Sequence, residues 1–204
     1  MDGVVLISGN GSNLQSIIDH STAIDLDIKA VISNHSSAYG LKRAERANIS
    51  THTLDHKQFS SREEFDQALS NIINQYNPEI VILAGFMRIL GAEFTHQYSG
   101  KMLNIHPSLL PKFQGLNTHQ RVIEAKESQH GVSIHFVTEQ LDGGPIIAQA
   151  SVDIIDIIDT DTAESLAKRV LLEEHKLFPK VIHWFTQGRL KLEKNHAILD
   201  GKVL

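Results

Sequence analysis

The stretch that decides the fold of this chain is Asn104-Ile105-His106-Pro107-Ser108-Leu109-Leu110-Pro111. It continues the apolar residues Met102–Leu103, a pattern typical of a buried strand. Because side chains alternate along a strand, we expect Asn104 and His106 on the same face, at its solvent end. Pro107 has no amide hydrogen for a sheet ladder, so the strand should end before it. The sequence predicts an amide and an imidazole side by side at a strand end.

A carboxylate is expected close to these two groups. Asp142 lies in the turn Leu141-Asp142-Gly143-Gly144-Pro145, some thirty-five residues further on. Asn104, His106 and Asp142 together could hold and protonate an oxyanion, which is what acyl transfer without a protein nucleophile requires. Asp142 would stabilise a protonated His106 and raise its pKa. The alternative is that Asp142 is an ordinary turn residue before a glycine.

Composition limits the classes of function. The chain has 204 residues, 41% of them hydrophobic, a net charge of −5 and no cysteine. This length favours a single domain over residues 1–204, and the acidic balance argues against nucleic acid as a partner. Without cysteine, disulfides and thiol catalysis are excluded. The N-terminus has no basic signal-peptide region and no apolar run has membrane length, which predicts a cytoplasmic protein without a membrane partner.

Short apolar runs alternate with helical patterns. The expected strands are Val4–Ile7, Ile28–Ile32, Ile80–Leu83, Met102–Ile105, Gly131–Thr138 and Ile146–Val152. The expected helices are Tyr39–Asn48, Ser61–Tyr76 and 162–184, the last kinked or divided at Pro179. Ser61 and Glu64 have the spacing of a capping box. The pattern predicts an α/β fold, a single-domain, mostly parallel twisted sheet with helices on both faces.

A glycine-rich loop, Ser8-Gly9-Asn10-Gly11-Ser12-Asn13, follows the first expected strand and opens a helix. Glycines let a ligand approach the backbone, and a helix N-terminus offers free N–H groups to an anion. No Gly-Lys-Ser/Thr follows, and Asn34 stands where a ribose-binding carboxylate would be needed, so neither a nucleotide triphosphate loop nor a dinucleotide site fits. A monophosphate site and a tight turn capped by Ser or Asn both remain open.

In this order the motifs resemble those of the phosphoribosylglycinamide formyltransferase family. The resemblance covers nearly the whole chain, through Ser8–Asn13, Ala84–Leu90, Asn104–Pro111, Ser133–Thr138, Leu141–Pro145 and Asp200-Gly201. It implies a Rossmann-like formyltransferase fold and transfer of a formyl group from 10-formyltetrahydrofolate to the glycinamide amine of 5-phosphoribosylglycinamide, in purine biosynthesis. It implies small-molecule substrates and no metal. The oligomeric state stays open.

The resemblance also assigns roles to individual residues. It implies that Asn104, His106 and Asp142 are catalytic. It implies a substrate site at Gly11, Ser12, Asn13 and Glu174. It implies a folate site at Arg62, Met87, Arg88, Ile89, Leu90, Asn104, Thr138, Glu139, Gln140 and Leu141, where 138–141 form a loop over the pterin. The chain departs from the family pattern at Leu171, Asn117 and Gln114.

Two other functions use some of the same residues. A hydrolase that releases formate from the same folate would need the same three catalytic groups, with water in place of the amine. A non-enzymatic nucleotide-binding module would explain Gly9–Asn13 alone. The phosphate loop favours a second, phosphorylated substrate and therefore a transferase. Of the 12 histidines, His119 and His135 could line the site or be packed structural residues, and Arg62, Arg88 and Glu174 could be solvated charges.

Overall fold

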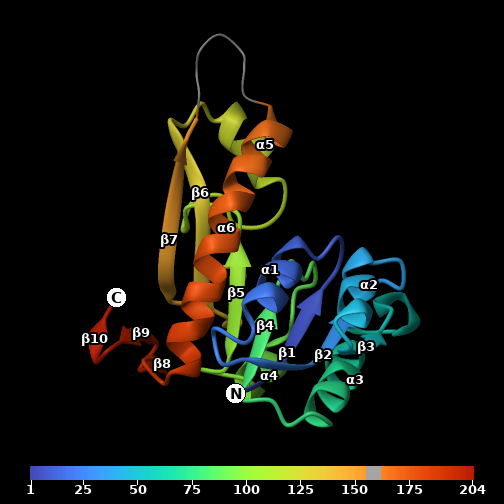
Figure 1. Cartoon of the computed structure of the whole chain (residues 1–204). Helices are drawn as coiled ribbons and strands as arrows, with labels where there is room; N and C mark the ends of the chain where they lie inside the picture. Colours follow the sequence, from blue (N-terminus) through green and yellow to red (C-terminus); the bar gives the residue numbers. More distant parts are fainter. Residues whose placement is uncertain (155–161) are drawn as a thin grey trace.

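The computed structural model, which describes residues 1–154 and 162–204, is built around a seven-stranded sheet (Figure 1). The strand order is β3-β2-β1-β4-β5-β6-β7. The strands are β1 (Asp2–Ile7), β2 (Asp27–Ser33), β3 (Ser50–Thr53), β4 (Ile80–Leu83), β5 (Met102–His106), β6 (Gln129–Phe136) and β7 (Ile146–Asp153). β1 to β5 run parallel, whereas β6 and β7 pair antiparallel. The predicted mostly parallel sheet is confirmed.

Helices cover both faces of this sheet (Figure 1). They are α1 (Ser12–His20), α2 (Tyr39–Arg46), α3 (Arg62–Asn74), α4 (Ala92–Gln97), α5 (Thr118–Glu124) and α6 (Ala163–Thr186), with a 3-10 turn at His56–Gln58. Alternation along β1 sends Val5 and Ile7 toward the core under α1, α2, α5 and α6. Val4 and Leu6 point the other way, toward α3 and α4. Both faces of β1 are therefore buried, as its continuous apolar sequence predicted.

Two details of the helices differ from expectation. Ser61 does cap α3 by accepting from the Glu64 N–H at 3.2 Å, but the Glu64 carboxylate accepts from the amide and hydroxyl of Ser60. Pro179 does not divide α6, which is one continuous helix. A proline inside a helix removes one backbone hydrogen bond. The burial of Phe178, Val181 and Ile182 around it offsets that loss.

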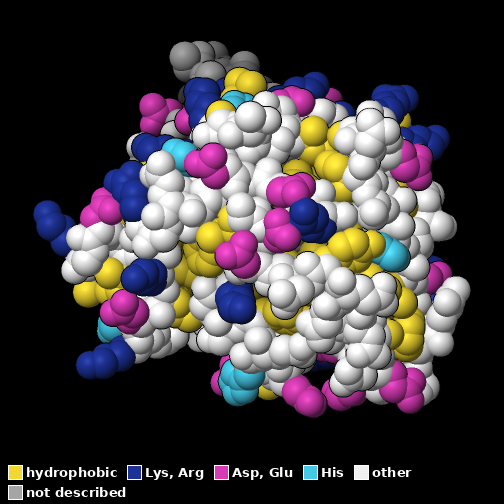
Figure 2. Space-filling view, turned by 60° about the horizontal axis from the view of Figure 1, so that its bottom comes forward, with side chains coloured by type: hydrophobic (Ala, Val, Ile, Leu, Met, Phe, Trp, Pro, Cys, Tyr) yellow, Lys and Arg dark blue, Asp and Glu magenta, His cyan; other side chains and the backbone are white. Residues whose placement is uncertain are grey.

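A second, three-stranded sheet of β8 (Leu190–Glu193), β9 (His196–Leu199) and β10 (Lys202–Val203) was not predicted. It packs on the main core through Leu190 and Ala197. Figure 2 shows acidic and basic side chains interspersed over one face of the molecule, rather than gathered into a patch of one sign. In the part of the chain that the structure describes, no helix is long and apolar enough to cross a membrane.

The carboxyl ends of β1, β2 and β4 are tied together by one hydroxyl group. The Ser8 hydroxyl donates to the Asn34 Oδ1 at 2.6 Å and accepts from the Met87 N–H at 2.7 Å. The Ser8 N–H also donates to the Gly85 carbonyl. Three loops that are distant in the sequence are thereby held at the edge of the sheet where α/β proteins place their sites.

The turn that carries Asp142 depends on a residue without a Cβ. A Cβ on Gly144 would lie 1.8 Å from the Phe136 carbonyl oxygen, so the backbone would have to move. We expect Gly144→Ala to lower the free energy of unfolding by roughly 3 kcal/mol, measured by denaturant titration. Gly9→Ala is the control, because a Cβ there meets nothing within 4 Å. Equal stability of the two variants would contradict this packing.

Candidate active site

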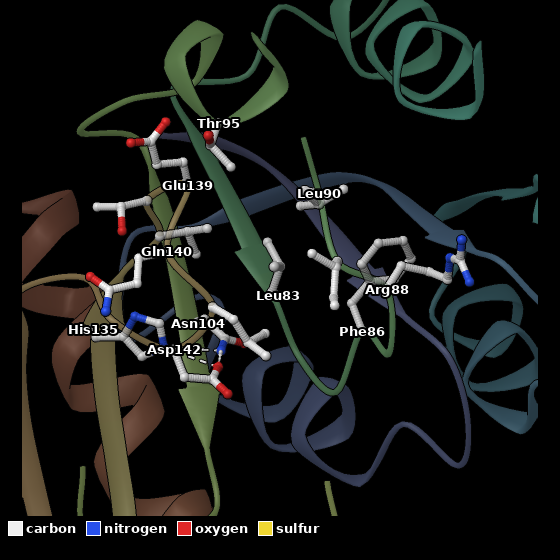
Figure 3. A pocket seen from close by; sticks show the side chains of 14 residues that line it. Leu83, Phe86, Arg88, Leu90, Thr95, Asn104, His135, Glu139, Gln140 and Asp142 are labelled. Carbon is white, nitrogen blue, oxygen red and sulfur yellow. Dashed lines mark hydrogen bonds and ion pairs between the residues drawn. The ribbon is translucent and has the colours of Figure 1, made fainter. Parts of the chain in front are cut away.

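A cavity of about 70 Å³ opens beside the ends of β4, β5 and β6 (Figure 3). Its apolar wall includes Leu83, Phe86, Leu90 and Val137. Its polar end is formed by Asn104, His135 and Asp142, whose side chains converge in Figure 3. Residues 138–141 cover one side. An apolar wall with a few polar groups at one end suits a flat organic ring, although small-molecule sites usually measure roughly 300–1,000 Å³.

The strand register pairs Asn104 with His135. The two residues are direct partners in the β5–β6 ladder, so their side chains lie on the same face. The His135 Nδ1 donates to the Phe136 carbonyl at 2.8 Å, and its Nε2 faces the Asn104 Nδ2 at 3.1 Å and the Asp142 Oδ1 at 3.7 Å. His135 thus fixes the orientation of the Asn104 amide.

Asp142 is the junction of the site. Its Oδ1 lies 3.4 Å from the Asn104 Nδ2, and its Oδ2 accepts from the Gly115 N–H at 2.9 Å. Oδ2 also lies 3.4 Å from the His106 Nδ1. Asn104 and His106 come from one strand end and Asp142 from the turn after β6, so the structure brings the predicted trio together. Asp142 is therefore more than a turn residue.

His106 is buried, not solvent-facing as expected, with 5% of its surface exposed. The Phe113 carbonyl, in the loop after β5, accepts from its Nε2 at 2.9 Å. Burial lowers the pKa of His106, and this outweighs the Phe113 carbonyl and the Asp142 carboxylate, which both raise it. As expected, the Asp142 carboxylate raises the pKa of His106. The net pKa of His106 is nevertheless below the ordinary value for histidine, because burial has the larger effect.

Asp142 shows the opposite balance. Burial would raise its pKa, but the His135 ring, the Gly115 N–H and the nearby His106 favour the ionised form, and the pKa is lowered. The resting site therefore combines an ionised carboxylate with an imidazole that gives up its proton easily. A new negative charge beside His106 would favour its protonated form.

The glycine-rich loop forms a second hollow of about 310 Å³ next to this cavity. Ser8 to Asn13 line one side, and His35 and Gly85 lie among the other lining residues. Gly11, in the left-handed region at φ 74°, caps α1 without any side-chain hydrogen bond. The alternative, a tight turn capped by Ser or Asn, required a side-chain cap, and in the described structure α1 has none. Its first N–H groups can therefore serve a ligand.

Glu174 lies at the inner end of this loop. Its carboxylate accepts from the Asn13 Nδ2 at 2.6 Å, although the two residues are 161 positions apart. Glu174 is 7% exposed, and burial raises its pKa against the effect of the Asn13 hydrogen bond. It is therefore not the solvated helix charge that was the alternative.

The residues assigned to a folate site fall into three groups. All except Arg62 and Met87 line the 70 Å³ cavity. Met87 lines the hollow of the glycine-rich loop instead. Arg62 is exposed at the start of α3, and its Cδ lies near Gly91, outside the cavity lining. The Arg88 guanidinium lies over the Phe65 ring at 5.9 Å and, in Figure 3, points away from Asp142.

Several site residues could not be identified from the sequence. The hydroxyl of Ser8 and the amide of Asn34 act across loops, and no spacing signals such a contact. Gln114, a departure from the family pattern, donates to the Asp142 carbonyl at 3.2 Å. His119 pairs with His130 at 2.9 Å and does not line the cavity. Among the described residues, no group of His, Asp or Glu side chains is arranged to hold a metal ion.

Comparison with known proteins identifies the family. Residues 1–182 match the formyl transferase family model. The phosphoribosylglycinamide formyltransferase of Escherichia coli K12 is 50% identical over 100% of this chain and 96% of its own length. That of Haemophilus influenzae is 48% identical over 98% and 94%. The chain belongs to the phosphoribosylglycinamide formyltransferase family. The motif-based prediction of a formyltransferase is confirmed.

A solved structure of this family has the same fold. The phosphoribosylglycinamide formyltransferase of Coxiella burnetii, solved in complex with CHES, superposes with a TM-score of 0.95. It is 51% identical and covers 100% of this chain and 95% of its own. The Rossmann-like α/β fold expected for this formyltransferase is confirmed.

The coupling of Asp142 to His106 can be measured. We expect Asp142→Asn to lower the pKa of His106 further, because the amide keeps the size but removes the negative charge that raises it. Turnover should fall by about 100-fold or more, as for loss of acid–base assistance. NMR titration of the imidazole follows the pKa. The control is Asp19→Asn, on the exposed side of α1. An unchanged His106 pKa in Asp142→Asn would show that the two groups are not coupled.

The buried carboxylate of Glu174 is expected to lower the stability of the folded enzyme at neutral pH. Its raised pKa means that the folded enzyme loses stability as pH rises from the ordinary value of 4.5 through the folded value. Glu174→Gln removes the buried charge and offers a donor to the Asn13 Oδ1, which is buried without a partner. The variant should therefore melt at a higher temperature than the wild type at pH 8, and the difference should vanish toward pH 4.5.

Glu173→Gln is the matched control for this experiment. Glu173 pairs with Lys176 near the surface, so its loss should change the melting temperature little. A Glu174→Gln variant less stable than the wild type at pH 8 would contradict the cost assigned to the buried carboxylate.

Proposed function

We propose that this formyltransferase moves the formyl group of 10-formyltetrahydrofolate directly to the glycinamide amine of 5-phosphoribosylglycinamide, with no covalent enzyme intermediate. Asn104, His106 and Asp142 are the catalytic residues in this proposal. The observation that supports it is the position of Asp142, which lines the cavity together with Asn104 and also contacts the buried His106 behind that lining, next to the hollow of the glycine-rich loop. The two reactants can thus meet at one point.

Asn104 and His106 would stabilise the charge that develops on the formyl oxygen. The Asn104 amide hydrogen that faces Asp142 makes only a long contact of 3.4 Å, so it can turn to an oxyanion while His135 holds the other. A negative charge next to His106 draws a proton to the imidazole and gives a charge-assisted hydrogen bond. One such donor is typically worth about 100- to 1,000-fold in turnover.

Asp142 and His106 would also move the proton. The amine nitrogen forms a bond to the formyl carbon, and the bond from that carbon to the folate nitrogen breaks. The proton that the amine loses must reach the departing nitrogen. The ionised Asp142 can accept it, directly or through a water, and His106 can pass it on because its pKa is low.

The folate site would be the cavity beside β4 and β5. Arg88, Ile89 and Leu90 line it, together with residues 138–141. At about 70 Å³ it is too small for a pterin ring, so residues 138–141 must shift outward on binding. Arg62, outside the cavity lining, and the Arg88 guanidinium, which points away from Asp142, would contact the acidic tail of the folate.

The phosphoribosyl group would lie in the loop hollow. The N–H groups of Gly11, Ser12 and Asn13 begin α1, where a phosphate is favoured by the helix dipole. Glu174 would face the amine end through its contact with Asn13. Residues 1–204 would act as one domain, because β8 and β9 share the core of α6.

Mixing the pure enzyme with 10-formyltetrahydrofolate, with and without 5-phosphoribosylglycinamide, tests this function. We expect folate turnover to depend on the ribonucleotide and to yield the formylated amide, because orientation of two reactants can lower the barrier by roughly 7–11 kcal/mol. Folate consumption and both products are measured by chromatography. Equal formate release in both mixtures would make the protein a hydrolase. Ribonucleotide binding without turnover would make it a binding module.

A further inference from the structure

We propose that Arg43 is a positioning residue of the phosphate loop, and that substrate affinity depends on it through the 5′-phosphate. Arg43 lies on α2 and does not line either cavity. The inference rests on the proposed phosphate site at Gly11, Ser12 and Asn13.

The guanidinium of Arg43 spans the loop from one end to the other. Its Nε donates to the Asn10 carbonyl and its Nη2 to the Asn10 Oδ1, both at 2.9 Å. Its Nη1 donates to the Gln15 Oε1 at 3.2 Å. Asn10 precedes the three phosphate residues and Gln15 follows them. One planar group with three differently directed donors therefore fixes the loop on both sides.

The start of α2 supports the same loop by direct contact. The Gly40 N–H donates to the Gly9 carbonyl at 3.1 Å. A Cβ on Gly11 would lie 2.6 Å from the Gly40 Cα, so the two backbones touch. Gly40 and Arg43 are three positions apart and share one face of the helix. The phosphate loop thus packs against α2, and the hydrogen bonds of the Arg43 side chain hold it in that position.

Charge gives Arg43 a second role. The residues that line the loop hollow include no lysine or arginine, and His35 is the one lining residue with an ionisable side chain. A phosphate dianion would therefore be held mainly by backbone N–H groups and hydroxyls. Arg43 brings a permanent positive charge to the back of the loop, where it favours the bound dianion without contact.

Arg46 offers a matched control on the same helix. Both guanidinium groups lie over the Tyr39 ring, Arg43 at 4.9 Å and Arg46 at 5.7 Å. Arg46 donates to the Tyr39 hydroxyl at 3.0 Å rather than to the loop. Replacing either residue by lysine removes a guanidinium group from the same ring, but only Arg43 reaches the loop.

The test compares Arg43→Lys with Arg46→Lys, using the phosphorylated substrate and the same compound without its phosphate. Lysine keeps the charge but cannot make three directed bonds. We expect Arg43→Lys to raise the KM for the phosphorylated substrate by roughly 10- to 100-fold, the loss typical of charge-assisted hydrogen bonds. The turnover number and the folate KM should stay within about twofold, and kcat/KM for the unphosphorylated compound should not change. Arg46→Lys should resemble the wild type.

Three outcomes would count against the inference, each for a different reason. If Arg43→Lys lowers kcat/KM equally for both compounds, Arg43 is a general structural residue. If Arg43→Lys keeps the wild-type KM, the loop does not need it. If the wild-type enzyme itself does not prefer the phosphorylated compound, the phosphate site is wrong and the inference falls with it.

A second variant keeps the test valid if Arg43→Lys does not fold. Gln15→Met removes the acceptor for the Arg43 Nη1, together with an exposed hydrogen bond from the Gln15 Nε2 to the Asp19 Oδ1 on the same helix, and Gln15 does not line the loop hollow. It should raise the KM for the phosphorylated substrate by a smaller factor and leave the unphosphorylated compound unaffected. Equal effects on both compounds would again contradict the positioning role.

Discussion

The site depends on the Asp142 carboxylate, which joins segments that the sheet brings together. It faces the Asn104 amide and the His106 ring from the end of β5 and the Gly115 N–H from the following loop. With 9% of its side chain exposed, the charge would be unfavourable without these partners. Their combined effect lowers its pKa. A single buried carboxylate thus organises both proposed oxyanion donors, Asn104 and His106, and the loop that contains Gly115.

Burial of His106 changes how the mechanism must work. A histidine beside a carboxylate is expected to be protonated at rest, but here burial lowers the pKa of His106 below its ordinary value. The imidazole therefore holds a proton less readily than an ordinary histidine, and negative charge that develops beside it would favour the protonated form. The Phe113 carbonyl fixes the ring through Nε2, so Nδ1 is the nitrogen that faces Asp142.

The sequence predicted those features that depend on local pattern. Apolar runs located six strands of the sheet, and the alternation rule placed Asn104 and His106 on one face. The sequence pattern did not predict β3, whose Ser50–Thr53 sequence is polar, or the small sheet of β8 to β10. Continuity of α6 through Pro179 depends on tertiary packing, which outweighs the local effect of proline.

The chemistry of the site was only partly predictable, for a physical reason. Residue types and spacing identified the trio, but the net pKa of His106 depends on how deeply the fold buries it. The pairing of His135 with Asn104 follows from strand register, which one sequence does not specify. Likewise the contact of Arg43 with Asn10 joins a helix to a loop 33 positions earlier. Such contacts exist only once the fold is formed.

The most direct test of the account is a crystal structure of the enzyme with 5-phosphoribosylglycinamide and a folate analogue that cannot transfer its formyl group. We expect the phosphate on the N–H groups of Gly11, Ser12 and Asn13. We also expect the amine and the formyl carbon in contact between Asn104, His106 and Asp142, with residues 138–141 displaced from their present position. A complex in which the formyl carbon lies away from Asp142, or the phosphate binds outside the loop, would contradict it.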